Sequence, residues 1–425
     1  MDLETFRSLL TDEGRSVLAA LQHADPADEA RTAAALRREH ADELVTAAVE
    51  QVRLRRAAAG RFGEFAPRMY FTPEGLALSS HLAVAEYKLL RVVGEMGVVL
   101  IDAMCLGGGH DATVLSWSHY TAAVDPDPLT VEMAAANREV LDAPMLILRR
   151  EDVMTFDSQG EAVFIDLKRH PGPLRGGAAE AGHPPLSWAS DRVRTTGLGW
   201  IRLAPDVRRT LPDLAATGAD EAEWISYGGE AQEAVLWYLG AGGDLEPPAP
   251  TRVPVRKVTL LPGGASLTGR GLPHPAVRPL GRYLYEPDPA VVHAGLLAEV
   301  AEEVHGGPVD PDGPLLTADA PHRTPFATAH RVTDVLRGED GAEDRGEDLR
   351  DLLRRALPGG HGVARIVLAS PGLDVDPEEF AQHLAPGGPD APTLFLTRTN
   401  AGPAAVTAQR VPEATATPAP AGSGT

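Results

Sequence analysis

The sequence predicts an α/β protein built around a largely parallel sheet, and three observations support that prediction. Short apolar runs rich in β-branched residues recur from about residue 98 onward, and helix-compatible stretches lie between the first of them. Several of these runs end at an aspartate. Buried strands that alternate with helices are typical of βαβ units, whose strands are parallel. Because ligands bind beyond the carboxyl ends of such strands, these aspartates are candidate site residues.

Length and composition set the broad class of the protein. The 425 residues exceed one ordinary domain, so we expect two or three. A hydrophobic content of 43% and a charged content of 23% allow a core and exclude a wholly disordered chain. The net charge of -21 excludes a generic nucleic-acid coat, because binding to phosphates needs clustered positive charge, although a local basic groove is compatible with this total.

Several kinds of site and location are disfavoured by what the sequence lacks. Cys105 is the only cysteine, which excludes an intrachain disulfide and a zinc site with several cysteine ligands. The 14 histidines show no H-x-x-x-H pair on a helix, so no metal is expected. No apolar run is long enough to span a membrane, and residues 1–6 do not resemble a signal peptide, so we expect a cytoplasmic protein without membrane contact.

Residues 1–80 are expected to form an N-terminal helical region. Apolar residues at helical spacing predict a helix over residues 3–10, which Gly14 is expected to end. Further helices are expected over residues 16–23 and 28–59. A small basic cluster is interpreted as a solvated helix face rather than a nucleic-acid contact, and it consists of Arg53, Arg55, Arg56 and Arg61.

Residues 81–250 are expected to form the α/β domain. Compact apolar runs predict its strands, and helix-compatible stretches at residues 111–118 and 129–141 connect the early ones. The last two runs are close enough in sequence to form an antiparallel hairpin at the end of the sheet. The predicted strands are residues 98–101, 121–124, 143–148, 162–165, 199–203, 223–227 and 234–237.

Residues 251–410 follow a Pro/Gly-rich break at residues 240–250 and are expected to form a second, smaller α/β region. The acidic run 338–348 is expected to be a solvated loop, and residues 411–425 a disordered tail. The other predicted elements are strands at residues 255–261 and 281–285, a helix from Asp288 to about residue 304, and then helix, strand, helix and strand at residues 349–357, 364–368, 376–384 and 393–396.

Aspartates follow the first four predicted strands, and they are Asp102, Asp125, Asp152 and Asp166. A carboxylate at the end of the second strand can accept both hydroxyls of a ribose, one after the third can accept an adenine amino group, and one at the fourth faces the chemistry. Three glycines at residues 107–109 let the backbone approach a ligand closely. A single glycine-rich turn is weak evidence, but the ordered series of acids indicates a nucleotide-type cofactor.

The position of Asp111 favours one such cofactor. NAD-binding chains usually place the pyrophosphate at the N-terminus of the helix that follows the glycine turn. Asp111 opens that helix here and would repel a pyrophosphate. S-adenosylmethionine, which has no phosphate linker, fits this position better.

The motifs around these acids resemble those of bacterial class I S-adenosylmethionine-dependent methyltransferases that carry a C-terminal THUMP-like domain. The family's first motif is like D-x-x-C-G-x-G-G-D, and the residues that match it are Asp102, Cys105, Gly108 and Gly109. Leu106 stands where the family has a glycine, and His110 where it has an acid. The second motif matches at residues 123–129, and the third matches at Asp152.

Later motifs extend the resemblance over most of the chain, apart from the acidic loop and the tail. The family's D-P-x-R-R element appears as Asp166-Leu-Lys-Arg169-His, which has Leu167 in place of the proline. Its K-x-x-P-G element becomes Arg202-Leu-Ala-Pro-Asp206. Further similar stretches are residues 184–187, 221–226, 233–237, 283–289 and 393–398.

The resemblance implies a Rossmann-like seven-stranded methyltransferase sheet, preceded by the helical region and followed by a THUMP-like region. It also implies methyl transfer from S-adenosylmethionine to a base of structured RNA, without a metal. The implied acceptor site contains Asp166 and Arg169. Beside it would lie a substrate-binding loop made of Pro184, Pro185, Leu186 and Ser187. The implied cofactor residues are Asp102, Cys105, Gly107, Gly108, Gly109, Asp125 and Asp152.

Two other functions are compatible with the sequence, and the oligomeric state is open. The changes at Leu106 and Leu167 fit a weakened or inactive relative that binds RNA or protein, and the acidic composition fits a small-molecule methyltransferase. Cys105 is interpreted as packing under the glycine turn rather than as a nucleophile, because no Pro-Cys loop surrounds it. Tyr283 and Tyr285 could stack on a base or pack within a strand.

Overall fold

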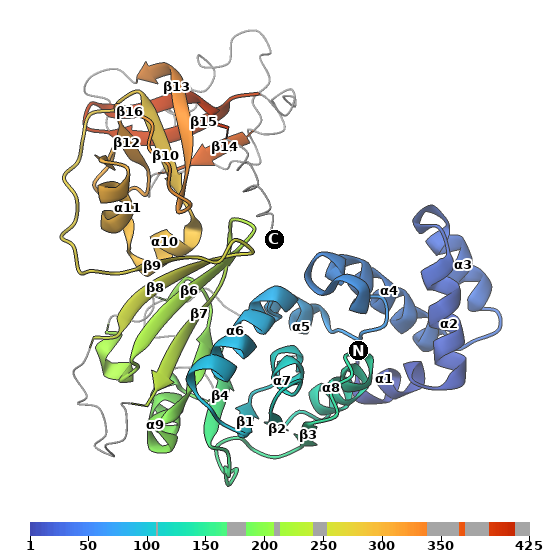
Figure 1. The fold of residues 1–425 in the computed structure, drawn as a ribbon. Helices are drawn as coiled ribbons and strands as arrows, with labels where there is room; N and C mark the ends of the chain where they lie inside the picture. The colour runs from blue at the N-terminus through green and yellow to red at the C-terminus, as the bar shows by residue number, and fades with distance from the viewer. Residues whose placement is uncertain are drawn as a thin grey trace, which may run out of the picture. The chain divides into compact units, whose positions relative to one another are not determined.

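The computed structural model describes residues 1–107, 109–167, 184–207, 213–240, 253–337, 365–369 and 391–412. It shows a mixed α/β protein that divides into two compact units, Met1–Thr268 and Gly269–Thr425, each of which is described by itself (Figure 1). Among the described helices, none combines the length and the apolar character that a membrane span requires. Within the same residues, no group of three or more His, Cys, Asp and Glu side chains is arranged to hold a metal.

The first unit begins with a layer of helices, drawn in blue in Figure 1. The predicted end of the first helix at Gly14 is wrong, because Thr11 caps a new helix that contains Gly14. A Cβ at Gly14 would lie 2.2 Å from the Ser8 carbonyl oxygen, so this glycine allows close packing of two helices. The helices are α1 (Leu3–Leu9), α2 (Asp12–His23), α3 (Glu29–Leu36), α4 (Asp42–Phe62), α5 (Pro73–Leu78) and α6 (Leu82–Glu95).

The single helix predicted over residues 28–59 is two helices, α3 and α4, which are joined by a turn at residues 37–41. The basic cluster on α4 is a solvated face only in part, because Arg53 and Arg56 are exposed while Arg55 is buried. Arg55 is 8% exposed and donates to the Met69 carbonyl oxygen at 2.8 Å. Arg53 and Arg56 both pair with Glu29. Arg53 and Arg56 therefore join α4 to α3 through Glu29 while they remain exposed, whereas Arg55 is part of the packed interior.

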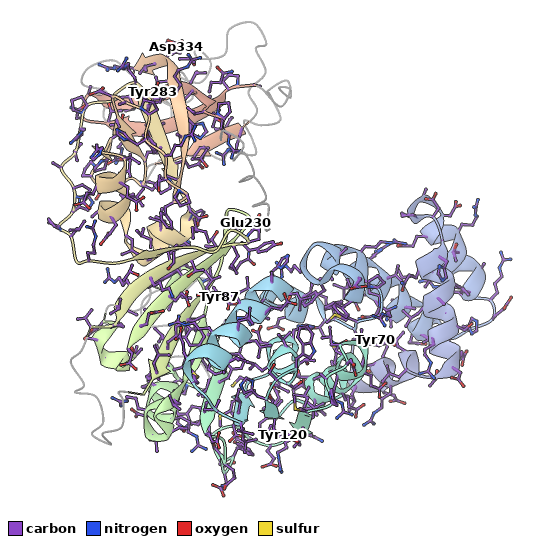
Figure 2. The ribbon with its side chains drawn as sticks, viewed as in Figure 1. Tyr70, Tyr87, Tyr120, Glu230, Tyr283 and Asp334 are labelled. Carbon is purple, nitrogen blue, oxygen red and sulfur yellow. The ribbon has the colours of Figure 1, made fainter. Side chains whose placement is uncertain are left out.

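The helical layer packs on α8 (Pro128–Val140), a helix that follows the second strand of the sheet. Met133 of α8 lies in one apolar cluster with Phe6, Leu9 and Val45 of the helical layer. Asn137 is fully buried and exchanges two hydrogen bonds with the backbone of Tyr70, which Figure 2 labels. The helical layer and the sheet domain are thus joined by a common core.

The first sheet has nine strands in the order β3-β2-β1-β4-β5-β7-β6-β8-β9. Strands β3, β2, β1, β4 and β5 are mutually parallel, whereas β7 is antiparallel to β5 and β6. The strands are β1 (Leu100–Met104), β2 (Tyr120–Val124), β3 (Leu146–Arg149), β4 (Ala162–Asp166), β5 (Leu198–Leu203), β6 (Glu221–Tyr227), β7 (Glu230–Leu239), β8 (Val255–Leu261) and β9 (Ala265–Thr268).

The predicted antiparallel pairing of β6 and β7 is confirmed, but the hairpin does not end the sheet, because β8 pairs with β6. Strands β8 and β9 lie beyond the domain boundary that we expected at residue 250. Helices α7 (His110–Leu115) and α9 (Leu186–Thr196) complete the unit. Residues of α6 and α7 pack in one apolar cluster with Phe164, Trp200 and Trp237 of the sheet.

The second unit contains a seven-stranded sheet in the order β11-β12-β10-β13-β16-β15-β14. The predicted helix from Asp288 begins as expected, with Pro289 at its first position, but Gly295 in a left-handed conformation ends it after six residues and a second helix follows. The elements are β10 (Tyr283–Pro287), α10 (Pro289–Ala294), α11 (Leu297–Glu303), β11 (Gly307–Pro308), β12 (Leu316–Ala318), β13 (Ala327–Arg337), β14 (Arg365–Leu368), β15 (Thr393–Thr399) and β16 (Gly402–Arg410).

Some predicted elements of this region lie outside the described residues. They are the acidic loop at residues 338–348, the helices at residues 349–357 and 376–384, and all but the first two residues of the tail at 411–425.

Candidate functional site

A cavity of about 510 Å³ lies in the first unit, next to the carboxyl ends of β1 and β2. One wall comes from the helical layer and the other from the glycine turn and the start of α8. The residues that line it are Met1, Thr72, Pro73, Glu74, Gly75, Leu78, Gly107, Asp127, Leu129, Thr130 and Met133. The helical layer therefore forms part of this site and does not merely precede it.

The glycine turn at residues 105–109 follows β1 and forms the sheet side of the cavity. Cys105, Gly107 and Gly109 have φ angles of 64°, 63° and 75°, in the left-handed region that favours glycine. Leu106 is not among the residues with positive φ. Its side chain is 7% exposed and packs in the apolar core beside the sheet. The leucine at this position is therefore accommodated without strain and without filling the cavity.

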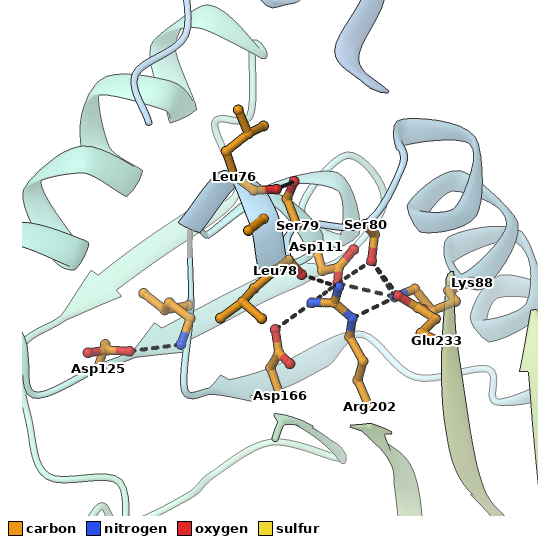
Figure 3. Close-up of polar contacts among 12 residues, drawn as sticks. Leu76, Leu78, Ser79, Ser80, Lys88, Asp111, Asp125, Asp166, Arg202 and Glu233 are labelled. Atoms are coloured by element: carbon orange, nitrogen blue, oxygen red, sulfur yellow. Dashed lines mark hydrogen bonds and ion pairs between the residues drawn. The ribbon is translucent and has the colours of Figure 1, made fainter. Parts of the chain in front are cut away.

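Asp125, the acid after β2, holds the turn in place. One carboxylate oxygen accepts the Leu106 N–H at 2.9 Å, as drawn in Figure 3, and the other accepts the Asp127 N–H at 3.0 Å. Asp125 is fully buried, while Asp127 lines the cavity. The predicted ribose acceptor thus lies directly behind the cavity wall.

The other predicted cofactor residues lie in different places. Asp102 does not end its strand, since the ladders with β2 and β4 continue to Met104. Its carboxylate accepts the Ser158 hydroxyl at 2.6 Å and the Gly160 N–H at 2.7 Å. Asp152 is exposed and caps a turn by accepting the Met154 N–H. Neither acid lines the cavity.

Two more predicted site residues, Gly108 and Arg169, lie outside the described residues. The predicted substrate loop is at the start of α9, where Pro185 is the N-cap residue. Pro184 and Leu186 are buried, and Ser187 is exposed. This loop does not line the cavity.

Asp166, the predicted acceptor-site acid, is the last residue of β4 and is 5% exposed. The Arg202 Nη1 atom donates to it at 2.7 Å and lies 3.3 Å from Asp111 Oδ2 (Figure 3). The Nε atom of the same guanidinium donates to Glu233 at 2.7 Å, and Nη2 donates to the Leu78 carbonyl oxygen at 2.6 Å. One arginine therefore contacts four segments of the chain.

Lys88 completes this set of charged residues, which we call the charge cluster and which consists of Lys88, Asp111, Asp166, Arg202 and Glu233. The Lys88 ammonium lies 2.5 Å from Glu233 and 3.1 Å from Asp111. Burial alone would lower the pKa of Arg202, but Asp166, Glu233 and Asp111 more than offset this effect and raise the pKa, so Arg202 stays charged. The two cations face three carboxylates, which leaves an excess of negative charge in a buried region.

His110 adjoins the cluster at the start of α7. Its ring lies 4.7 Å from the ring of Phe62 and 5.5 Å from that of Phe71, measured between centroids. Burial, together with the charge of Arg202, lowers the pKa of His110 to about 4, so the ring is neutral near pH 7. Within the described residues, His110 Nε2 and Asp111 Oδ1 are buried without a hydrogen-bond partner.

Sequence reasoning did not assign roles to Arg202, Glu233 and Lys88, and it missed the helical wall of the cavity. One signal was present for the charged residues. Lys88 is followed directly by Leu89 and Leu90, and Glu233 by the apolar run 234–237, and a charge beside such residues is buried only when it is paired. No comparable signal pointed to Met1 or to α5 as cavity walls.

The two tyrosines of β10 differ in their surroundings. Tyr285 is fully buried, and its hydroxyl accepts the His322 N–H at 2.7 Å, so it packs within the fold. Tyr283, labelled in Figure 2, lines a cavity of about 560 Å³ in the second unit together with Arg331 and Gln409.

Comparisons with known proteins extend these observations. The model of a domain of unknown function (DUF8688) matches residues 2–58, which include α1 to α3 and most of α4 of the helical layer. Two relatives from Mycobacterium tuberculosis, strains CDC 1551 / Oshkosh and ATCC 25618 / H37Rv, are each named an uncharacterized S-adenosylmethionine-dependent methyltransferase. Each is 28% identical over 361 residues, which cover 83% of this chain and 93% of the relative.

A solved structure shares the fold. The crystal structure of a "putative methyltransferase" from Porphyromonas gingivalis W83 matches with a TM-score of 0.65 and 17% identity, and the match covers 97% of this chain and 100% of that chain. The mixed α/β fold of the present chain is thus that of a protein described as a methyltransferase.

Proposed function

We propose that this protein is an S-adenosylmethionine-dependent methyltransferase whose cofactor binds in the cavity beside the glycine turn. The observation that carries the proposal is the position of this cavity, which is bounded by Gly107 and by the segment after Asp125 at the edge of parallel strands. Its volume of about 510 Å³ falls within the usual range for small-molecule sites. The names of the two M. tuberculosis relatives support the same reading.

The charges around the cavity favour this cofactor over a dinucleotide. Among the described residues that line it, the charged side chains are Glu74 and Asp127, both acidic. A pyrophosphate would meet two carboxylates here, and the side chains of these lining residues offer it no guanidinium or ammonium group. A sulfonium cation would be attracted by them and by the excess negative charge of the charge cluster.

The residues of the site would have separate roles in binding and in methyl transfer. Gly107, Gly109 and the backbone of the turn would hold the cofactor. Asp125, directly behind the cavity wall, would accept its ribose hydroxyls in addition to the Leu106 and Asp127 N–H groups, since a carboxylate can accept about four hydrogen bonds. The cofactor supplies an activated methyl group when bound. Asp166 would accept hydrogen bonds from the acceptor nitrogen and hold its lone pair toward that methyl group, so that orientation provides most of the rate.

We further propose, on the resemblance to class I enzymes with a THUMP-like domain, that the acceptor is a base of structured RNA. The alternative of an inactive relative rests on Leu106 and Leu167. The core position of Leu106 and the hydrogen bond from the Leu167 N–H to the Arg202 carbonyl oxygen, 2.9 Å long, favour the active reading, because both residues are accommodated.

Calorimetric titration with S-adenosylmethionine and with its demethylated product tests the cofactor. We expect micromolar binding by the wild-type protein, loss of binding in Asp125→Ala and weakened binding in Asp125→Asn. Glu151→Ala, which removes an exposed acid just beyond β3, is the matched control and should bind normally. Absence of binding to the wild-type protein, or normal binding by Asp125→Ala, would contradict the assignment.

The acceptor is tested separately. Incubation of the protein with radiolabelled S-adenosylmethionine and total bacterial RNA should transfer label to RNA. Filter binding of the same RNA over a salt series should show affinity that falls as salt rises. Cofactor binding without labelling or binding of RNA would favour a small-molecule acceptor.

A further inference from the structure

One guanidinium links the wall of the cavity to the acceptor-site acid. Arg202 Nη2 donates to the carbonyl oxygen of Leu78, which lines the cavity, and Nη1 donates to Asp166 (Figure 3). Arg202 is 2% exposed, so water does not compete for these hydrogen bonds. The cavity wall and Asp166 are therefore held at a fixed separation by a single planar group.

The remaining contacts of Arg202 keep that group from rotating. Its Nε atom donates to Glu233 on β7, and Glu233 is held in turn by Lys88 and by the Ser80 hydroxyl at 2.5 Å each. Each of the three guanidinium nitrogens therefore donates to a different chain segment. A lysine has one ammonium on a flexible stem and cannot reproduce this set of directions.

We propose that Arg202 is a positioning residue for the proposed methyl transfer, which fixes Asp166 relative to the segment of the cavity wall at Leu78. This role rests on the proposed function. When the bound cofactor orders the wall at Leu78, the hydrogen bonds of Arg202 also fix Asp166. Asp166 then holds the acceptor at the required distance from the methyl group. Displacement of a reacting group by about 1 Å can cost about 100-fold in rate, so the role has a measurable consequence.

The test compares two identical substitutions of buried arginines in the same unit. Arg202→Lys keeps the positive charge but cannot reach Leu78, Asp166 and Glu233 together. Arg91→Lys is the matched control, because Arg91 is 8% exposed and pairs with Glu221 and Glu223, away from Asp166 and the cavity. The measurements are kcat and KM with total bacterial RNA, calorimetric affinity for S-adenosylmethionine, urea unfolding and amide hydrogen exchange over residues 72–80.

We expect Arg202→Lys to lower kcat by about 10- to 100-fold while KM for RNA changes by less than about twofold. Exchange over residues 72–80 should become faster, and the affinity for S-adenosylmethionine should weaken by several-fold. Arg91→Lys should lose stability by a similar amount but keep kcat, cofactor affinity and exchange at residues 72–80 near the wild-type values.

The outcomes separate the positioning role from the proposed function. Wild-type cofactor binding combined with an unchanged kcat in Arg202→Lys overturns the positioning role alone, as does an equal loss of kcat in both variants. A wild-type protein that binds no S-adenosylmethionine overturns the proposed function, and the role of Arg202 in methyl transfer with it.

Discussion

The Asp125 carboxylate and the Leu106 amide nitrogen lie 2.9 Å apart, in a hydrogen bond that joins the end of β2 to the turn after β1. Both residues are buried. This bond explains how a turn with leucine at its second position keeps its shape: the backbone at 106 is held by an acid, while left-handed conformations fall on Cys105, Gly107 and Gly109.

Removal of that acid should destabilise the fold as well as the site. In Asp125→Ala the buried amide of Leu106 and the partly buried amide of Asp127 lose their acceptor, so we expect the free energy of unfolding to fall by about 1–3 kcal/mol. Asp125→Asn keeps one acceptor oxygen and should lose less. Urea unfolding of the three proteins at pH 7 measures both effects, and equal stability of Asp125→Ala and wild type would disprove the structural role.

Restoring the family's glycine at position 106 should be harmful. Leu106→Gly removes a buried side chain and adds backbone freedom, which together should cost about 2–5 kcal/mol of stability. Cofactor affinity should not improve, because the leucine does not line the cavity. Cys105→Gly is the informative neighbour and should cost less, since glycine relieves a left-handed φ. Tighter cofactor binding by Leu106→Gly would show that the leucine crowds the site.

The proline of the family's catalytic element should not help this chain either. Leu167→Pro removes the N–H that donates to the Arg202 carbonyl oxygen at 2.9 Å and leaves that oxygen without this donor. We expect lower stability and no gain in methyl transfer to RNA. Leu167→Ala keeps the amide and separates loss of the side chain from loss of the hydrogen bond. A gain in kcat for Leu167→Pro would instead support the alternative that this chain is a weakened relative of an active methyltransferase.

His110 should make the protein sensitive to acid. Its pKa is about 4 in the folded protein, below the value near 6.5 of an unfolded chain, so the unfolded state binds the proton first as the pH falls. Stability should therefore drop as the pH decreases from about 6.5 to about 4, by up to about 3 kcal/mol from this residue. His110→Gln should lack this component. Urea unfolding at pH 7 and pH 4.5 checks it, and parallel losses in both proteins would refute it.

Asn137 should stabilise the packing of the helical layer against the sheet domain. Asn137→Ala leaves the N–H and the carbonyl oxygen of Tyr70 without their side-chain partners in a buried position, so we expect a loss of about 2–4 kcal/mol. Arg7→Ala breaks an exposed pair with Glu132 at the same junction and should have a much smaller effect. Thermal unfolding of both variants measures the contrast, and equal losses would contradict it.

Local patterns were sufficient to predict most strands of the first sheet and its β6–β7 hairpin. A strand such as residues 162–165 is a run of consecutive apolar residues, and turns are marked by neighbouring residues. Periodicity along the sequence therefore predicts both. The predictions failed where packing overrode a local signal. Gly14 sits inside α2 because two helices approach closely there, and β1 continues past Asp102 because ladders on both sides extend it.

The sequence by itself determined that this is an α/β protein with a glycine-rich turn after its first strand and acids near the ends of later strands, because those features depend on neighbouring residues. Only the tertiary structure decided which residues meet. Ser80 bonds to Glu233 across 153 positions, and Leu78, Asp166 and Arg202 converge from three separate segments. The direction of a buried side chain and the partner of a buried charge are set by contacts between distant segments, which no local pattern encodes.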